Sequence, residues 1–243
     1  MSDRTCCPLV ELRQYTLVGG QRERLIALFD GEFIETQEAT GITVIGQFRD
    51  LNNSDRFVWL RGFDDMPTRA RALHEFYGGP AWKTHREAAN ATMIDSDNVL
   101  LLRPAWPTSG FQLEKAKRPP IASTTTREDL FLAMIYHLGK ASGADFAAFF
   151  ERELQPRLTK AGVSVLASFV TETHPNTFPR LPVRENANVF VWFARFLDSK
   201  AYEKCLAAIG GSILEKEPAG KLPALIVDEP EILMLSPTAR SLL

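Results

Sequence analysis

The stretch Phe57-Val58-Trp59-Leu60-Arg61-Gly62-Phe63 returns 133 residues later as Phe190-Val191-Trp192-Phe193-Ala194-Arg195-Phe196. Other positions repeat at an offset of 121, among them Tyr15 with Tyr136, Phe29 with Phe150, Gly41 with Gly162 and Phe48 with Phe169. The offset grows because residues 173–185 replace the short connection 49–56 with a longer loop. Self-similarity over such a length predicts two fused copies of one small domain rather than a solenoid.

Composition is that of an ordinary globular chain. The formal net charge of −2 lacks the basic stripe that nucleic-acid binding requires and gives no polybasic signal for an acidic membrane. Cys6, Cys7 and Cys205 are too few for a disulfide framework, so we expect reduced thiols. Residues 1–5 contain no apolar targeting region, and no apolar run is long enough to span a membrane. The prediction is a cytoplasmic protein without a membrane span.

Each half contains the pattern of a βαββαβ unit. In the first half, residues 9–17, 42–49, 57–63 and 99–103 read as strands. Helical spacing marks residues 25–33, which precede Gly41, and a second helix that begins near Pro67; a shorter helix is expected over 81–92. The second half fills the same slots with strands at 130–138, 163–170, 189–196 and 232–235 and helices at 146–158 and 202–209. We therefore predict an α+β fold: a first ferredoxin-like repeat over 1–104, a linker over 105–126 and a second, diverged repeat over 127–243.

The third strand of each half is apolar on both faces. By the period of two, Phe57, Trp59 and Arg61 share one face, while Val58 and Leu60 share the other. A sheet with helices on one side and this much apolar surface on the other must bury both sides. The economical arrangement is a single-chain barrel in which the two sheets pack face to face, with a cavity expected between them.

Four stretches of the first half resemble the NIPSNAP family of the dimeric α+β barrel group. They are Val10-Glu11-Leu12-Arg13-Gln14-Tyr15, Phe57 to Phe63, Phe76-Tyr77-Gly78-Gly79-Pro80-Ala81-Trp82 and Asp95 to Pro104. The resemblance is close over residues 9–104 and only in outline in the second half, where Gly210-Gly211-Ser212 replaces the Gly-Gly-Pro segment. It implies the barrel fold and no settled activity; related barrels include cofactor-free monooxygenases, haem-degrading enzymes and isomerases.

Arg61 is the most informative polar residue, because an unpaired charge within an apolar strand is costly. One interpretation has it point into the cavity and hold a carboxylate, phenolate or other anion beside Trp59. The other places it at a barrel rim, paired with Asp95 or Asp97. The second repeat has Ala194 at this position and moves its arginine to Arg195, on the opposite face. Any cavity should therefore be polar on one side only.

His85 is the second candidate catalytic residue. It shares a helix face with Trp82, where it could act as a general base, although a structural, hydrogen-bonded histidine is favoured. The corresponding segment of the second repeat contains Pro218 and Pro223, which interrupt a helix, so chemistry is expected in the first half. The remaining candidate ligand-binding residues are Trp59, Tyr15, Arg13, Trp82 and Trp192. Tyr15 is matched by Tyr136, which favours a structural role.

Two functions compete. The first is the binding of a small hydrophobic or aromatic molecule in a pocket between the sheets, with cofactor-independent oxygenation or isomerisation as the reaction. The second is a non-catalytic interaction protein in which aromatic residues only join the halves. The direction of the apolar residues over 73–82 distinguishes them: inward for a pocket lid, outward for an interface. The histidines lack partners at metal-ligand spacing, so neither a metal nor a cofactor is predicted; self-association is compatible with the fold.

Overall fold

The structure, a computed structural model, describes residues 5–125, 127–209 and 225–243. The first repeat runs through strand β1 (Leu9–Leu17), helix α1 (Arg22–Leu28), a π-helical segment (Phe29–Phe33), α2 (Ile34–Glu38), β2 (Thr43–Asp50), β3 (Arg56–Phe63), α3 (Met66–Gly78), α4 (Pro80–Asn90) and β4 (Met93–Pro104). The second comprises β5 (Leu130–His137), α5 (Gly143–Phe149), a π-helical segment (Phe150–Leu154), α6 (Gln155–Lys160), β6 (Ser164–Thr171), β7 (Val189–Phe196), α7 (Ser199–Ile209) and β8 (Glu231–Pro237). The predicted helices and strands are present in the predicted order, with their ends shifted by a few residues.

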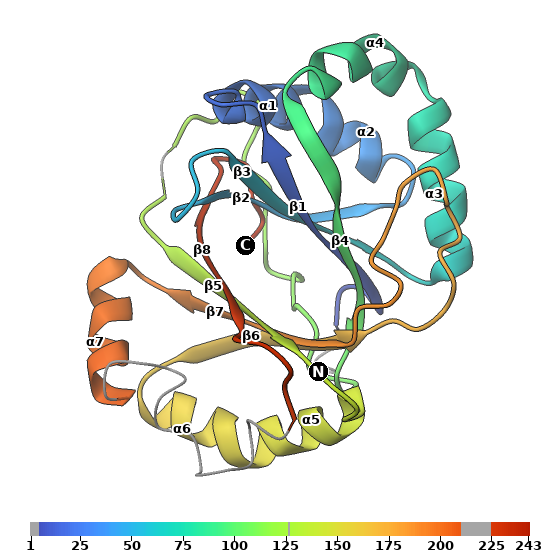
Figure 1. The fold of residues 1–243 in the computed structure, drawn as a ribbon. Coiled ribbons are helices and arrows are strands. Elements are labelled where there is room, and N and C mark those ends of the chain that lie inside the picture. Colours follow the sequence, from blue (N-terminus) through green and yellow to red (C-terminus); the bar gives the residue numbers. More distant parts are fainter. Residues whose placement is uncertain (1–4, 126, 210–224) are drawn as a thin grey trace.

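All eight strands close into one antiparallel barrel in the order β1-β3-β2-β8-β5-β7-β6-β4. Each half supplies four neighbouring strands in the ferredoxin-like order, and the helices of each half lie on the outside of its own sheet (Figure 1). The halves meet at two short seams, where only three residue pairs join β2 to β8 and three join β4 to β6. The predicted single-chain α+β barrel is confirmed.

The duplication extends to local irregularities of the backbone. The π-helical segments lie 121 residues apart, and a register shift between Val44 and Gly46 in β2 recurs between Val165 and Ala167 in β6. Gly41 and Gly162 both have φ of 87°, the left-handed conformation that ends the preceding helix without strain. These shared features therefore belong to the scaffold. The predicted proline-broken segment around Gly210, Pro218 and Pro223 lies outside the described residues.

The barrel interior is filled with apolar side chains from both repeats. Val58 and Leu60 of β3 pack there with Ile135 and Val191 of the second repeat, in one buried cluster to which Cys7 and Phe111 also belong. Phe57, Trp59 and Phe63 lie on the opposite face of β3, against the helices. The expectation of a pocket between the sheets is therefore wrong for Trp59 and Arg61. Alternation predicted which residues share a face but not which face turns inward, because both are apolar.

The seam between β2 and β8 is extended by the residues that follow β8. The amide of Thr238 donates to the carbonyl of Gln47, and Arg240 donates to the backbone oxygen of Asp30 and pairs with Glu35. Burial raises the pKa of Asp30 to about 6, although a hydrogen bond from Thr238 and the charge of Arg240 oppose the shift. Ionised Asp30 thus lowers the free energy of unfolding at neutral pH.

Asp30→Asn should stabilise the protein at pH 7.5 but not at pH 4. The pKa of Asp30 is raised from 3.8 to about 6 on folding, so protonation stabilises the folded state below pH 3.8, and this contribution is lost as the pH rises through 6. The Asn side chain does not ionise, so the variant avoids this loss of unfolding free energy, which is roughly 2–3 kcal/mol. Urea unfolding of both proteins at the two pH values measures the difference; an equal gain at pH 4 and 7.5 would show that charge is not the cause.

Among the described helices none is long and apolar enough to cross a membrane.

Candidate functional site

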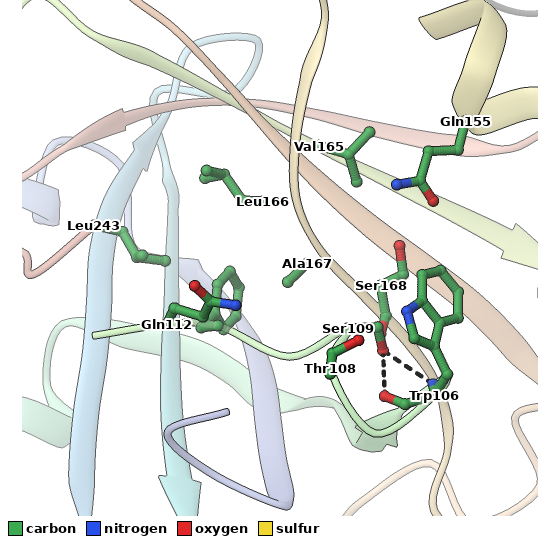
Figure 2. Close-up of a pocket in the computed structure, with 11 residues that line it drawn as sticks. Trp106, Thr108, Ser109, Gln112, Gln155, Val165, Leu166, Ala167, Ser168 and Leu243 are labelled. Carbon is green, nitrogen blue, oxygen red and sulfur yellow. Dashed lines mark hydrogen bonds between the residues drawn. The ribbon is translucent and has the colours of Figure 1, made fainter. Parts of the chain in front are cut away.

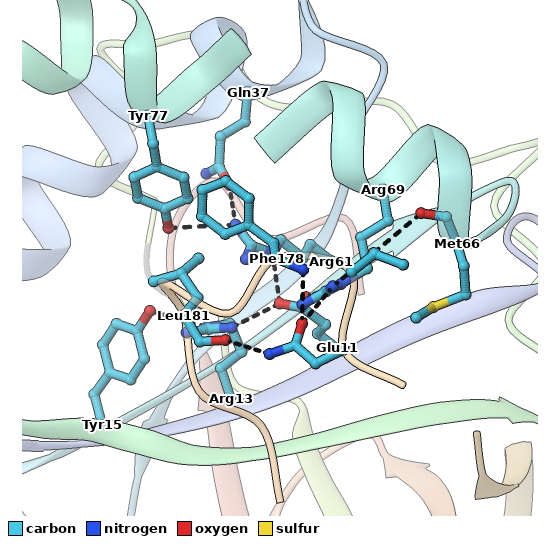
Figure 3. A network of polar contacts seen from close by, with 12 residues as sticks. Glu11, Arg13, Tyr15, Gln37, Arg61, Met66, Arg69, Tyr77, Phe178 and Leu181 are labelled. Atoms are coloured by element: carbon cyan, nitrogen blue, oxygen red, sulfur yellow. Dashed lines mark hydrogen bonds and ion pairs between the residues drawn. The ribbon is translucent and has the colours of Figure 1, made fainter. Parts of the chain in front are cut away.

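A cluster of four buried charged side chains lies between the sheet of the first repeat and its helices (Figure 3). Glu11 and Arg13 extend from β1, Arg61 from β3 and Arg69 from α3. All four side chains have no exposed surface. β1 and β3 pair antiparallel with Glu11 opposite Arg61, and the period of two brings Arg13 to the same face.

The Glu11 carboxylate binds all three arginines. Its Oε2 accepts from Arg61 Nε and Arg13 Nη1, both at 2.7 Å, and its Oε1 accepts from Arg69 Nε at 2.6 Å. Burial alone would raise the pKa of Glu11, but the charges of Arg61, Arg13 and Arg69 outweigh it and hold that pKa well below its usual range. Glu11 is therefore ionised at any ordinary pH.

The cluster has more positive than negative charge. Three guanidinium groups share one carboxylate, which leaves a net charge of +2, and no other acidic side chain of the described chain pairs with them. The Nη2 atoms of Arg13, Arg61 and Arg69 are buried without a hydrogen-bond partner among the described residues. Aromatic faces offset part of the cost: Arg61 Cζ lies 5.1 Å from the Trp59 ring centroid, and Arg13 Cζ lies 5.4 Å from that of Tyr15. They do not neutralise the charge.

A small cavity adjoins the cluster on the helix side of the sheet. Its volume is about 30 Å³, room for one or two water molecules. Its walls are mostly aromatic and come from β1, β3, the start of β4 and the helices of the first repeat: Tyr15, Leu25, Phe29, Phe33, Gln37, Trp59, Phe76, Tyr77, Trp82, Ala89 and Met93. Of the predicted ligand-binding residues, this cavity brings together Tyr15, Trp59 and Trp82.

The polar side of the cavity is connected to the arginines. Tyr15 Oη accepts from Arg13 Nε at 2.9 Å, and Gln37 Oε1 accepts from Arg61 Nη1 at 3.2 Å. Tyr77 Oη also accepts from Arg61 Nη1, in a long contact of 3.5 Å. Burial raises the pKa of Tyr15 despite the nearby charge of Arg13, so this phenol stays protonated. Within the described chain neither hydroxyl proton has a protein acceptor, and the buried Trp59 Nε1 is also unpaired.

The second repeat builds the same strands without any of these charges. β5 and β7 pair in the same register as β1 and β3, so that Leu132 opposes Ala194 where Glu11 opposes Arg61. Met134 takes the place of Arg13, and all three replacements are completely buried. The scaffold therefore does not need the charges. Arg195, shifted by one residue as predicted, lies on the other face and pairs with Asp129.

The long loop of the second repeat crosses to the first. Arg69 Nη1 donates to Asn176 Oδ1 at 2.9 Å and to Thr177 Oγ1 at 3.2 Å. The Phe178 ring stacks on Tyr77 with centroids 5.8 Å apart, and Phe178 belongs to the buried cluster of the first repeat. Figure 3 shows Phe178 and Leu181 over Arg61 and Glu11. The long loop, which has only a short counterpart in the first repeat, thus covers the charged cluster.

The expected partners of Arg61 and the expected place of Trp192 are wrong, whereas His85 has a polar partner, as its favoured interpretation predicts. Arg61 pairs with Glu11 and not with Asp95 or Asp97, which belong to a mostly exposed part of β4. His85 does not line the cavity; its Nε2 lies 3.4 Å from Glu32 Oε2, which connects α4 to the π-helical segment. Trp192 is buried in the helix-side cluster of the second repeat, away from the other candidates. Among the described residues no group of His, Cys, Asp and Glu could hold a metal ion.

A second hollow of about 480 Å³ lies beside β6 (Figure 2). It is bounded by the residues after β4, which continue the β4–β6 seam: the Ala105 amide donates to the Ser168 carbonyl and the Ser168 amide donates to that of Ser109. Its lining residues carry no charged side chain, and none of the predicted site residues lies there. The hollow is larger than the first-repeat cavity but lacks a comparable concentration of functional groups.

Comparison with known proteins supports the assignment of the fold. Residues 10–107 match the NIPSNAP family model, which confirms the resemblance for the first repeat. A search of curated protein sequences gives no match.

Solved structures match over both repeats. A proposed monooxygenase from Fusobacterium nucleatum has a TM-score of 0.58 at 10% identity and covers 96% of this chain and 93% of its own. A proposed monooxygenase from Lactobacillus acidophilus has a TM-score of 0.54 at 11% identity and covers 95% and 94%. An anthrone oxidase-like protein has a TM-score of 0.52 at 10% identity and covers 95% and 91%. At these identities the similarity establishes the barrel fold alone.

Proposed function

We propose that the first repeat binds a small aromatic molecule in the cavity between its sheet and helices. The observation that carries this proposal is the cavity wall itself. Most of the lining residues are aromatic. They include Tyr15, Tyr77 and Trp59, whose hydroxyl or indole protons have no protein acceptor among the described residues. An apolar pocket with a few convergent polar groups is the usual form of a small-molecule site.

A ligand larger than water needs one wall to move, and α4 is the weakest wall. Ala89 is its one fully buried residue, and Trp82 is only partly buried against Phe33 and Tyr77. The helix follows Gly79, where a Cβ would lie 3.0 Å from the Glu75 carbonyl oxygen, so a larger residue would disturb this tight junction. Outward movement of α4 would enlarge the cavity without breaking the barrel.

The competing interaction function is less well supported. Leu73 and Phe76 of α3 are buried, and both belong to the cluster around the cavity. These apolar residues therefore turn inward, the direction expected of a pocket wall. Cofactor-independent oxygenation or isomerisation fits such a water-excluding site. The resemblance in fold to proposed monooxygenases and an anthrone oxidase-like protein agrees with it but does not identify a reaction, because one fold hosts many chemistries.

Ala89→Leu should weaken binding by extending a larger side chain into the cavity. The measurement is equilibrium dialysis with an uncharged aromatic probe, 4-nitroanisole, for which we expect at least a tenfold loss of affinity, about 1.4 kcal/mol. Ala147→Leu is the matched control, since Ala147 is buried in the second repeat and does not line this cavity. Equal affinity in wild type and Ala89→Leu would contradict the proposed location. Oxygen uptake with bound substrates tests the reaction separately.

A further inference from the structure

We propose that the natural ligand of this cavity is an organic anion, an aromatic body with an acidic oxygen that seats against Tyr15, Tyr77 and Trp59. The inference rests on the proposed function and specifies its ligand class. It follows from the net charge of +2 in the buried cluster, which no acidic side chain of the described residues balances.

The excess positive charge of the cluster is expected to destabilise the folded protein, which suggests a functional role for the charge. A buried group of ion pairs is often no more stabilising than apolar residues of similar volume. In the second repeat, the buried apolar residues Leu132, Met134 and Ala194 occupy the equivalent positions in the same strand register. A cluster with two excess positive charges gains most when an anion completes it.

The hydrogen bonds are directed so that the charge reaches the cavity. Arg13 donates to Tyr15 Oη and Arg61 donates to Tyr77 Oη, which leaves both hydroxyl protons available. A hydroxyl whose oxygen already accepts from a cation is a stronger donor, because linked hydrogen bonds polarise one another. An acidic oxygen of the ligand would thus meet neutral donors backed by guanidinium groups one hydrogen bond away.

The arrangement favours an anion over a neutral molecule of the same shape. Hydrogen bonds to a charged acceptor are roughly twice as strong as those between neutral groups. The ligand would also take part in the charge balance of the cluster without displacing Glu11. Phenolates and carboxylates share this chemistry, so the experiment includes both.

The test compares matched charged and neutral probes by equilibrium dialysis: 4-nitrobenzoate against its methyl ester, and 4-nitrophenolate against 4-nitroanisole. For wild type we expect at least one anion to bind about tenfold or more tightly than its neutral partner. The variant Glu11→Leu, Arg13→Met, Arg61→Ala, Arg69→Met, which carries the residues of the second repeat at three positions, should lose this preference, so that each anion binds no more tightly than its neutral partner. Preference in one pair identifies the acidic group and supports the inference.

The possible failures are distinguishable. Equal affinity for charged and neutral partners in wild type would overturn the inference while leaving the aromatic pocket in place. An anion preference that survives in the four-residue variant would also overturn it, because the anion would then bind elsewhere. Absence of binding by all four probes would overturn the proposed function and the inference with it. The wild-type comparison requires no variant, so it remains decisive if the four-residue variant does not fold.

Discussion

Glu11→Gln lowers the free energy of unfolding by about 3–5 kcal/mol, the expected cost of leaving buried charges without a partner. The amide has nearly the same shape as the carboxylate, but it removes the charge that faces Arg13, Arg61 and Arg69. Urea unfolding at pH 7 measures the effect. Glu23→Gln is the control: Glu23 pairs with Arg49 at the surface, and its loss should cost less than about 1 kcal/mol.

The effect of Glu11→Gln also depends on pH in a defined direction. The pKa of Glu11 is lowered on folding, so its stabilisation is present above the ordinary value of 4.5 and is lost as the pH falls below it toward the lower folded value. The difference between wild type and Glu11→Gln should therefore be constant from pH 6 to 9 and shrink in acid. A difference of less than about 1 kcal/mol at pH 7 would show that the ion pairs do not hold the cluster together.

The four-residue apolar variant should behave in the opposite way. Replacing Glu11, Arg13, Arg61 and Arg69 together removes both the attraction and the burial cost of four charges. The outcome should be a protein about as stable as wild type, because the space that Arg61→Ala leaves empty offsets part of the gain expected when buried ion pairs are replaced by apolar residues of similar volume. Leu132, Met134 and Ala194 show that this face of the fold accepts such side chains.

Thermal and urea unfolding measure that variant, with Glu11→Leu alone as the comparison. The single change keeps three unpaired arginines and should be strongly destabilising, whereas the four changes should not. This contrast separates a functional cluster from a structural one. If the four-residue variant folds but is several kcal/mol less stable than wild type, the cluster supports the first repeat.

Most of the fold could be predicted from the sequence. The repeated stretch around Trp59 and Trp192 predicts an equivalent third strand in each half, and Gly41 correctly marks the end of a helix. The sequence misplaced the pocket because alternation assigns residues to faces without orienting them. Since both faces of β3 are apolar, only packing of the whole chain decides that Trp59 faces the helices.

The site was predicted only in part for related reasons. The sequence predicts Arg61 of the third strand and Arg13 and Tyr15 of the first as site residues. It does not single out Glu11, which lies opposite Arg61 and is replaced by Leu132 in the second repeat. That mismatch is a signal the sequence contains. Arg69 has no such signal, because it reaches the cluster through the packing of α3 on the sheet. The contacts of Asn176 and Thr177 depend on a loop more than 100 residues away.

The buried cluster of the first repeat has a net positive charge that an anionic ligand would balance. The most direct test is the absorbance spectrum of 4-nitrophenol bound to the wild-type protein, at a pH where the free probe is mostly the colourless neutral phenol. We expect the bound probe to have the yellow phenolate spectrum, since the cluster stabilises the anion and lowers the pKa of the probe. A bound probe with the spectrum of the neutral phenol would contradict it.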